Sequence, residues 1–332
     1  MADDTILPDD PGAELRALLA EGRYQEVLAA FRELPSDQVK AEVQLVAATA
    51  ATRLGDLRLA TALAEAALAR FRTRADEDGR MRASNLLGVL SFERGNLTRA
   101  RGHFGEALDI AGRLQDSLMT ARASNNLASI ADLVGDPEEA LSLYRYALLN
   151  YQRLGDRRGA AESYHNLGIV FRQMREWDDA VSSATEAVRH AEMVREPALV
   201  ALAVGGRAEI DLRRGDSPMA RREVLRAGNL ADQAGDELGV IEAGRLQALV
   251  DLADGDHQAA AAGAEAARRK AESAHAPLLQ AECAAAAARA LKALGRRADA
   301  DIRYREAVAL FESLGARRRL EDFGLLWEES QP

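Results

Sequence analysis

The small and apolar positions of this chain recur with a period of forty residues. Glycine occupies six positions on this spacing, and Arg175 stands at the one remaining position of the series. The six glycines are Gly55, Gly95, Gly135, Gly215, Gly255 and Gly295. Glycine adopts, without steric penalty, the left-handed conformation that commonly ends a helix. The pattern therefore predicts a helix end and a turn near each of these seven positions.

Three further columns of small residues keep the same period. Alanine lies five and twelve residues after each turn position, and alanine or glycine lies seven residues before it. Small residues at this spacing let two antiparallel helices approach closely. A consistently apolar column follows two residues after the first small position: Leu90, Ile130, Val170, Ile210 and Val250. We therefore expect seven helical hairpins, each of which buries its apolar face only by stacking on its neighbours.

The residue after the turn position is usually one that caps the start of a helix. These residues are Asp56, Asn96, Asp136, Asp216 and Asp256. Their side-chain oxygens can accept a hydrogen bond from an unpaired backbone N–H of the first helical turn. In the third repeat Pro137 follows, where its missing N–H costs nothing. A second helix is therefore expected to begin directly after each turn.

The columns of small residues, glycine and alanine resemble those of the tetratricopeptide repeat. The forty-residue length is similar to the variant in kinesin light chains and in the sensor regions of bacterial signalling regulators. The linker YQRLGDRRGAAESYHNLG at 151–168 is similar to those of the regulators. The resemblance implies an all-α fold, an α-solenoid of helical hairpins wound into a right-handed superhelix with a concave groove.

We predict that residues 11–328 form a single solenoid, preceded by a disordered tail at 1–10. A shorter hairpin is expected at 11–35, the seven repeats at 36–316, and a final helix at 317–329. That last helix carries the apolar residues Phe323, Leu326 and Trp327. It either caps the last apolar face of the solenoid or forms a contact patch for a dimer or partner.

Composition and charge exclude several functional classes. The 332-residue chain has a formal net charge of −10, so a basic stripe for nucleic acid is not expected. The acidic first ten residues lack the pattern of a signal peptide, and no apolar run approaches the roughly 18 residues of a membrane span. The single cysteine calls for no oxidising compartment. We expect a cytoplasmic protein that binds neither membrane nor nucleic acid.

The sequence contains no arrangement of residues typical of an enzyme. The five histidines fall in different repeats without metal-ligand spacing, and the glycines are periodic helix ends rather than a phosphate-binding loop. Cys283 lies in an alanine-rich helix and is expected to be buried and inert. We predict no catalytic residue, no metal site and no cofactor.

A polar stripe lies between the two buried faces of each first helix, where the resemblance implies the concave groove. The stripe and its margins contain Arg82, Asn85, Arg122, Asn125, Asn126, Asp132, His165, Asn166 and Arg172. Asn126 and Asn166 share one repeat position, and similar proteins use groove asparagines to bind the backbone of an extended peptide. The arginines would favour acidic side chains or a terminal carboxylate. Alternatively, the amides tie one repeat to the next or face water.

Two functions remain after these exclusions. The first is a non-catalytic scaffold or adaptor that binds another protein or an extended peptide in the groove. The second is a regulatory subunit of a bacterial signalling system that senses a ligand or peptide.

Overall fold

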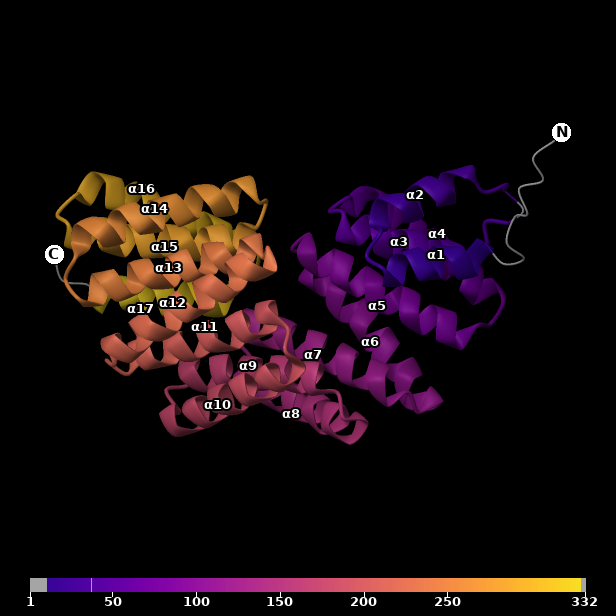
Figure 1. The fold of residues 1–332 in the computed structure, drawn as a ribbon, viewed down its shortest axis with the longest axis horizontal. Helices are drawn as coiled ribbons and strands as arrows, with labels where there is room; N and C mark the ends of the chain where they lie inside the picture. The colour runs from indigo at the N-terminus through magenta and orange to yellow at the C-terminus, as the bar shows by residue number, and fades with distance from the viewer. Residues whose placement is uncertain (1–10, 37, 330–332) are drawn as a thin grey trace. The chain divides into compact units, whose positions relative to one another are not determined.

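The computed structural model describes residues 11–36 and 38–329, and within these ranges every regular element is a helix (Figure 1). The all-helical prediction is thus confirmed. The described residues divide into two compact units, one ending at Asn126 and the other beginning at Leu127. The expected tail at residues 1–10 lies outside the described residues. A single continuous solenoid stays a prediction.

The first unit contains a short hairpin followed by two complete repeats and the start of a third. Its helices are α1 (Pro11–Ala20), α2 (Tyr24–Glu33), α3 (Ala41–Arg53), α4 (Leu57–Thr73), α5 (Glu77–Glu93) and α6 (Leu97–Leu114). Helix α7 (Ser117–Val134) begins in the first unit and ends in the second. The core of this unit is built from alanine, leucine and a few aromatic side chains such as Phe71 and Phe104.

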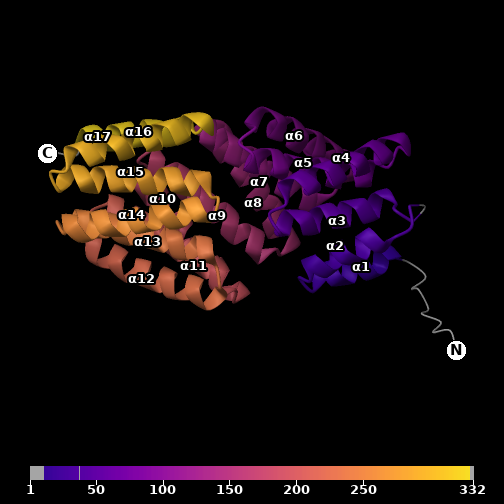
Figure 2. The ribbon, with the colours of Figure 1, turned by 90° about the horizontal axis from the view of Figure 1, so that it is seen from above.

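The second unit continues with the same alternation of helices. Its helices are α8 (Pro137–Leu154), α9 (Arg157–Gln173), α10 (Trp177–Val194), α11 (Pro197–Arg213), α12 (Ser217–Ala234), α13 (Glu237–Ala253), α14 (His257–Ser273), α15 (Pro277–Ala293), α16 (Arg297–Ser313) and α17 (Arg317–Glu329). The first helices of successive repeats, α9, α11, α13 and α15, contact one another in order. These four helices form one layer, whose exposed side is called here the inner face of the second unit. Figure 2 shows α17 beside α16 at the end of the stack.

The seven predicted turns are present. Backbone φ is positive, between 62° and 89°, at all seven positions, including the non-glycine Arg175. The cap residues act as expected, since Asp56 and the others accept a hydrogen bond at 2.9–3.1 Å from the backbone N–H three residues later. The small residues of the three columns are buried, and Ala60 and Ala100, for example, have no exposed surface. The left-handed backbone is therefore present at all seven turns, and a side-chain cap follows at the five that have aspartate or asparagine there.

A second series of left-handed turns lies twenty residues out of phase with the first. Its members are Ala75, Gln115, Gly155, Arg195, Gly235, His275 and Gly315. Glycine occupies only three of these seven positions, so the glycine pattern does not reveal them. Aspartate caps the next helix at four of them, for example Asp116, which accepts from the Met119 N–H at 2.9 Å. These turns join one hairpin to the next.

Candidate functional site

Helix α17 lies across the inner face of the second unit. The Arg318 guanidinium donates to the backbone carbonyl of Gln173 at 2.8 Å, although the two residues are 145 positions apart. Arg319 lies 3.6 Å from Asp132 and 3.4 Å from Glu282. Helix α17 is thus joined to α7, α9 and α15 by charged and hydrogen-bonded contacts. The sequence analysis anticipated a cap or an interface patch but not this position.

The other side of α17 is held by aromatic packing. Phe323 and Trp327 stack against Tyr304 of α16, with ring centroids 5.2 and 4.8 Å away. Lys292 donates to the backbone carbonyl of Trp327 at 2.8 Å and lies 4.6 Å from the centre of its ring. Phe323 is buried, and Trp327 contacts the apolar cluster of α15. These contacts hold α17 on the last repeat and orient its charged side toward the inner face.

Beneath α17, carboxylates and guanidinium groups are buried together. Glu209 of α11 accepts from Arg172 of α9 at 2.5 Å and from Arg245 of α13 at 3.2 Å. Burial alone would raise the pKa of Glu209, but Arg172 and Arg245 hold it well below its usual range. Arg245 also pairs with Glu242 at 2.5 Å. Glu209 is therefore an ionised carboxylate that links three neighbouring helices.

Glu282 of α15 lies in a different electrostatic environment, although it is close to Arg245 and Arg319. Burial raises the pKa of Glu282 above its usual value, and the two arginines only partly oppose this. For Arg319 the balance is reversed, because Asp132 and Glu282 raise its pKa more than burial lowers it. The group Asp132, Arg172, Glu209, Arg245, Glu282 and Arg319 is called here the inner cluster.

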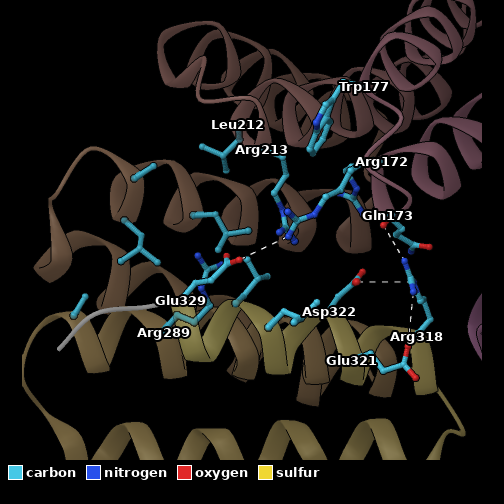
Figure 3. Close-up of a pocket in the computed structure, with 17 residues that line it drawn as sticks. Arg172, Gln173, Trp177, Leu212, Arg213, Arg289, Arg318, Glu321, Asp322 and Glu329 are labelled. Atoms are coloured by element: carbon cyan, nitrogen blue, oxygen red, sulfur yellow. Dashed lines mark hydrogen bonds and ion pairs between the residues drawn. The ribbon is translucent and has the colours of Figure 1, made fainter.

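A cavity of about 620 Å³ opens beside the inner cluster, between α17 and the ends of α9, α10, α11, α13 and α15 (Figure 3). Five arginines and three carboxylates line it, so its wall carries more positive than negative charge. The arginines are Arg172, Arg175, Arg213, Arg289 and Arg318. In a chain whose net charge is −10, this is a local concentration of positive charge.

The predicted groove residues divide between the two units. In the first unit, Asn126 donates to Asn85 at 3.4 Å, so these amides join α7 to α5. Arg82 is exposed and pairs with Asp78 of its own helix, and Arg122 is also exposed. Asn125 of this unit and Asn166 of α9 in the second unit are both half-buried and make polar contacts. The Asn85–Asn126 contact is of the inter-repeat kind that the sequence left open as an alternative.

In the second unit the predicted residues Asp132, His165 and Arg172 lie near one another, and Asp132 and Arg172 belong to the inner cluster. The His165 ring lies against α11, where Gly206 has no side chain: a Cβ at this position would be 2.5 Å from Nδ1. Burial, reinforced by the positive charge of Arg172, lowers the pKa of His165 to about 4. His165 is therefore neutral near pH 7.

The sequence analysis missed Glu209, Arg213, Arg245, Glu282 and Arg289. Two of them stand in columns that the polar stripe had already marked: Arg245 lies eighty residues after His165, and Glu282 lies 160 residues after Arg122. Carrying these columns into the later repeats would have found both, whereas Glu209, Arg213 and Arg289 stand in other columns. The predicted set relied on the asparagine columns, and the later repeats have no asparagine in these columns.

The single cysteine of the chain lies in the core. Cys283 is fully buried, as predicted, and burial raises the pKa of its thiol to about 12. No group of three or more histidine, cysteine, aspartate or glutamate side chains is placed to hold a metal ion in this part of the chain. No helix among those described is long and apolar enough to cross a bilayer. The site is suited to recognition through charge and shape.

Comparison with known families identifies the repeat. Residues 79–151 and 134–193 match the tetratricopeptide repeat family. Residues 79–193 thus consist of tetratricopeptide repeats. These matches cover the second to fourth repeats, from α5 through α10, and the same columns of small residues continue on both sides of them. No curated protein sequence matches the chain.

Solved structures with similar folds include a Rap protein, NprR and BtubC. A Rap protein complexed with Competence and Sporulation Factor is 14% identical with a TM-score of 0.66, over 97% of this chain and 98% of that one. NprR in complex with its cognate peptide NprX is 12% identical with a TM-score of 0.68, over 98% of each chain. BtubC from P. vanneervenii is 24% identical with a TM-score of 0.52, over 70% of this chain and 93% of that one. At these identities the likeness establishes a shared tetratricopeptide repeat fold.

Proposed function

We propose that this protein is a non-catalytic scaffold or regulator that binds a peptide, or an extended segment of another protein, on the inner face of its second unit. The observation that carries the proposal is the 620 Å³ cavity between α17 and the first helices of the repeats. Its size is within the range of ligand pockets, and its wall combines apolar side chains with eight charged ones. The peptide complexes of NprR and a Rap protein, which share this fold, support the choice of ligand.

The proposal includes a cytoplasmic setting in a bacterial cell and excludes nucleic acid as the partner. A net charge of −10 disfavours phosphate backbones, and a single buried cysteine suits a reducing compartment. Of the nine residues predicted from the sequence, Asp132, His165, Asn166 and Arg172 belong to the second unit and remain candidates within this proposal, and Arg172 lines the cavity.

A selection from a displayed random-peptide library, followed by fluorescence polarisation with the selected peptides, tests the proposal. The critical variant is Leu325→Arg, which places a long cation at an exposed leucine that lines the cavity. Leu225→Arg is the matched control, because Leu225 is a similarly exposed leucine on α12 away from this cavity. We expect selected peptides to bind the parent and Leu225→Arg but not Leu325→Arg. Binding that is unaffected by Leu325→Arg would place the site elsewhere.

The position of α17 favours the regulatory form of this function over a passive scaffold. A ligand in the cavity contacts α17 directly, because Glu321, Asp322, Leu325 and Leu326 line one wall. Ligand binding would then shift α17 relative to the inner face, and a shift of population needs such a differential contact. Limited proteolysis with and without a selected peptide measures this. A changed cleavage rate within α17 supports a sensor, whereas unchanged cleavage supports a scaffold.

A further inference from the structure

Two of the five arginines in the cavity lie apart from the carboxylates of the described residues. Arg213 of α11 and Arg289 of α15 have no carboxylate oxygen within 4.0 Å among the described residues. The Nε atom of Arg289 is buried and has no hydrogen-bond partner there. Burial and the nearby charge of Arg213 lower the pKa of Arg289 to about 10, and burial also lowers the pKa of Arg213. Both side chains therefore remain charged near pH 7, close to each other.

The carboxylates of the cavity are already engaged. Arg318 lies 3.8 Å from Glu321 and 3.9 Å from Asp322, and Arg175 lies 3.7 Å from Glu329. Just beneath the cavity, Glu209 pairs with Arg172 and Arg245. A cation removed from water without a partner is unfavourable. Arg213 and Arg289 thus add positive charge to the cavity, and the more distant carboxylates Glu209, Asp322 and Glu329 offset it only in part.

The rest of the cavity wall is largely apolar. Leu212, Leu249 and Leu252 contribute from α11 and α13, and Trp177 contributes from the start of α10. Figure 3 shows Arg213 and Trp177 on one wall and Arg289 on the other. A ligand here therefore meets two guanidinium groups beside a hydrophobic surface.

We infer that the cavity binds an amphipathic organic anion, with its acidic group at Arg213 and Arg289 and its apolar part against the three leucines and Trp177. The inference rests on the proposed function to the extent that the same cavity is used, and it adds the chemical class of the ligand. Guanidinium groups bind carboxylates through paired, charge-assisted hydrogen bonds. The anion has two sources, the acidic residue or terminus of a peptide and a free organic acid.

Tryptophan fluorescence provides a direct measurement, because Trp177 lines the cavity and Trp327 lies on α17. The full chain is titrated with three probes: the peptide acetyl-Leu-Leu-Glu with a free carboxyl end, its neutral analogue acetyl-Leu-Leu-Gln-amide, and octanoate. We expect the acidic peptide to bind about tenfold or more tightly than the neutral one. The double variant Arg213→Gln/Arg289→Gln is expected to lose this difference. Arg214→Gln, which removes an exposed arginine next to Arg213, is expected to keep it.

Thermal melting of the same proteins gives an independent readout. Without ligand, the double variant is expected to melt at the same temperature as the parent or above it, because two unpaired buried charges are removed. A saturating anion should raise the melting temperature of the parent and of Arg214→Gln only. A double variant that melts well below the parent would show that the arginines are structural and overturn the inference.

The three probes separate this inference from the proposed function. Equal binding of the acidic and neutral peptides overturns the anion site and leaves peptide binding intact. Binding of octanoate but neither peptide supports the anion site and counts against the peptide function. Binding of no probe, or an acid preference that survives the double variant, overturns the inference.

Discussion

The inner helices of the two units share the same repeat positions but stabilise their polar groups in different ways. In the first unit α5 and α7 meet through two neutral amides, Asn85 and Asn126, 3.4 Å apart. In the second unit the equivalent helices α9, α11 and α13 meet through the ionised pairs of Glu209 with Arg172 and Arg245. A half-exposed neutral amide loses little solvation free energy, whereas a charge that is removed from water is unfavourable without a close partner.

The difference shows what α17 contributes. The inner cluster contains three carboxylates and three guanidinium groups, and Arg319 of α17 supplies the contact that joins Asp132 to Glu282. Charge pairs in the first unit lie nearer water, as at Glu106, which Ser84, Arg72 and Arg80 contact at 2.9–3.2 Å. Helix α17 thus covers charge in the second unit, and the energetics of the two units should respond differently to matched substitutions.

The largest expected effect comes from removing Arg319. Arg319→Ala leaves Asp132 and Glu282 buried without their shared cation, which should cost about 3–5 kcal/mol of unfolding free energy. Arg317→Ala, an exposed arginine on the same helix, is the control and should change stability little. Chemical denaturation followed by circular dichroism measures both. Equal stability of the two variants would mean that the contacts of α17 with the inner face contribute nothing.

Two glycines at the same repeat position should respond in opposite directions. A Cβ at Gly88 would lie 2.5 Å from the ring of Phe104, which is buried and cannot move aside, whereas at Gly168 the nearest atom is 3.5 Å away. We expect Gly88→Ala to cost about 1–3 kcal/mol through overpacking. Gly168→Ala should be neutral or stabilising by up to about 1 kcal/mol, because alanine is the better helix former. Thermal and urea unfolding of both variants checks this, and a loss of stability at Gly168 would contradict the packing described here.

The pH dependence of stability should separate His165 from His103. The folded pKa of His165, about 4, lies below the roughly 6.5 of an unfolded chain, so the unfolded state binds the proton first. The stability that the neutral ring contributes is complete above about pH 6.5 and is lost as the pH falls, by about 2 kcal/mol at pH 5 and about 3 kcal/mol at pH 4. Burial also lowers the pKa of His103 in the first unit, but the effect should be smaller. The unfolding free energies of His165→Gln and His103→Gln at pH 7 and pH 5 test this. Only His165→Gln should clearly reduce the loss of unfolding free energy between pH 7 and pH 5.

The smallest effect is expected at the asparagines of the first unit. Asn126→Ala removes one long, half-buried hydrogen bond to Asn85, worth about 0.5–1 kcal/mol or less. A double-mutant cycle with Asn85→Ala measures the coupling between the two amides. If Asn126→Ala weakens binding of a selected peptide while stability stays unchanged, the asparagines contact the ligand, as the sequence first suggested.

Much of the fold could be predicted from the sequence because its causes are local. Gly135 ends a helix, Asp136 caps the next one, and Pro137 fits its first turn, all within three consecutive residues. The second series of turns was harder to find, because residues such as Gln115 and His275 take the left-handed conformation that glycine would have marked. An aspartate that caps the next helix follows four of these turns, and these aspartates indicate the turns in the sequence.

The candidate site was only partly accessible in this way. The polar stripe, including Asp132, His165 and Arg172, follows from helical periodicity alone. The ion pair between Asp132 of this stripe and Arg319 does not follow from periodicity. The two residues are 187 positions apart, and their contact depends on where α17 packs. That Arg213 and Arg289 have no carboxylate within 4.0 Å among the described residues is likewise invisible in the sequence, which is rich in carboxylates that could have been their partners.

The sequence by itself determined the repeat, its period, the helix ends and the faces that must be buried, since each follows from backbone geometry and the size of nearby side chains. Only the tertiary structure decided which charges are paired. An ion pair depends on distances of a few ångströms between helices that are far apart in the chain, and on how much water remains around them. In the second unit the packing of α17 sets these distances and the amount of water around the charges. It also forms one wall of the cavity that contains Arg213 and Arg289.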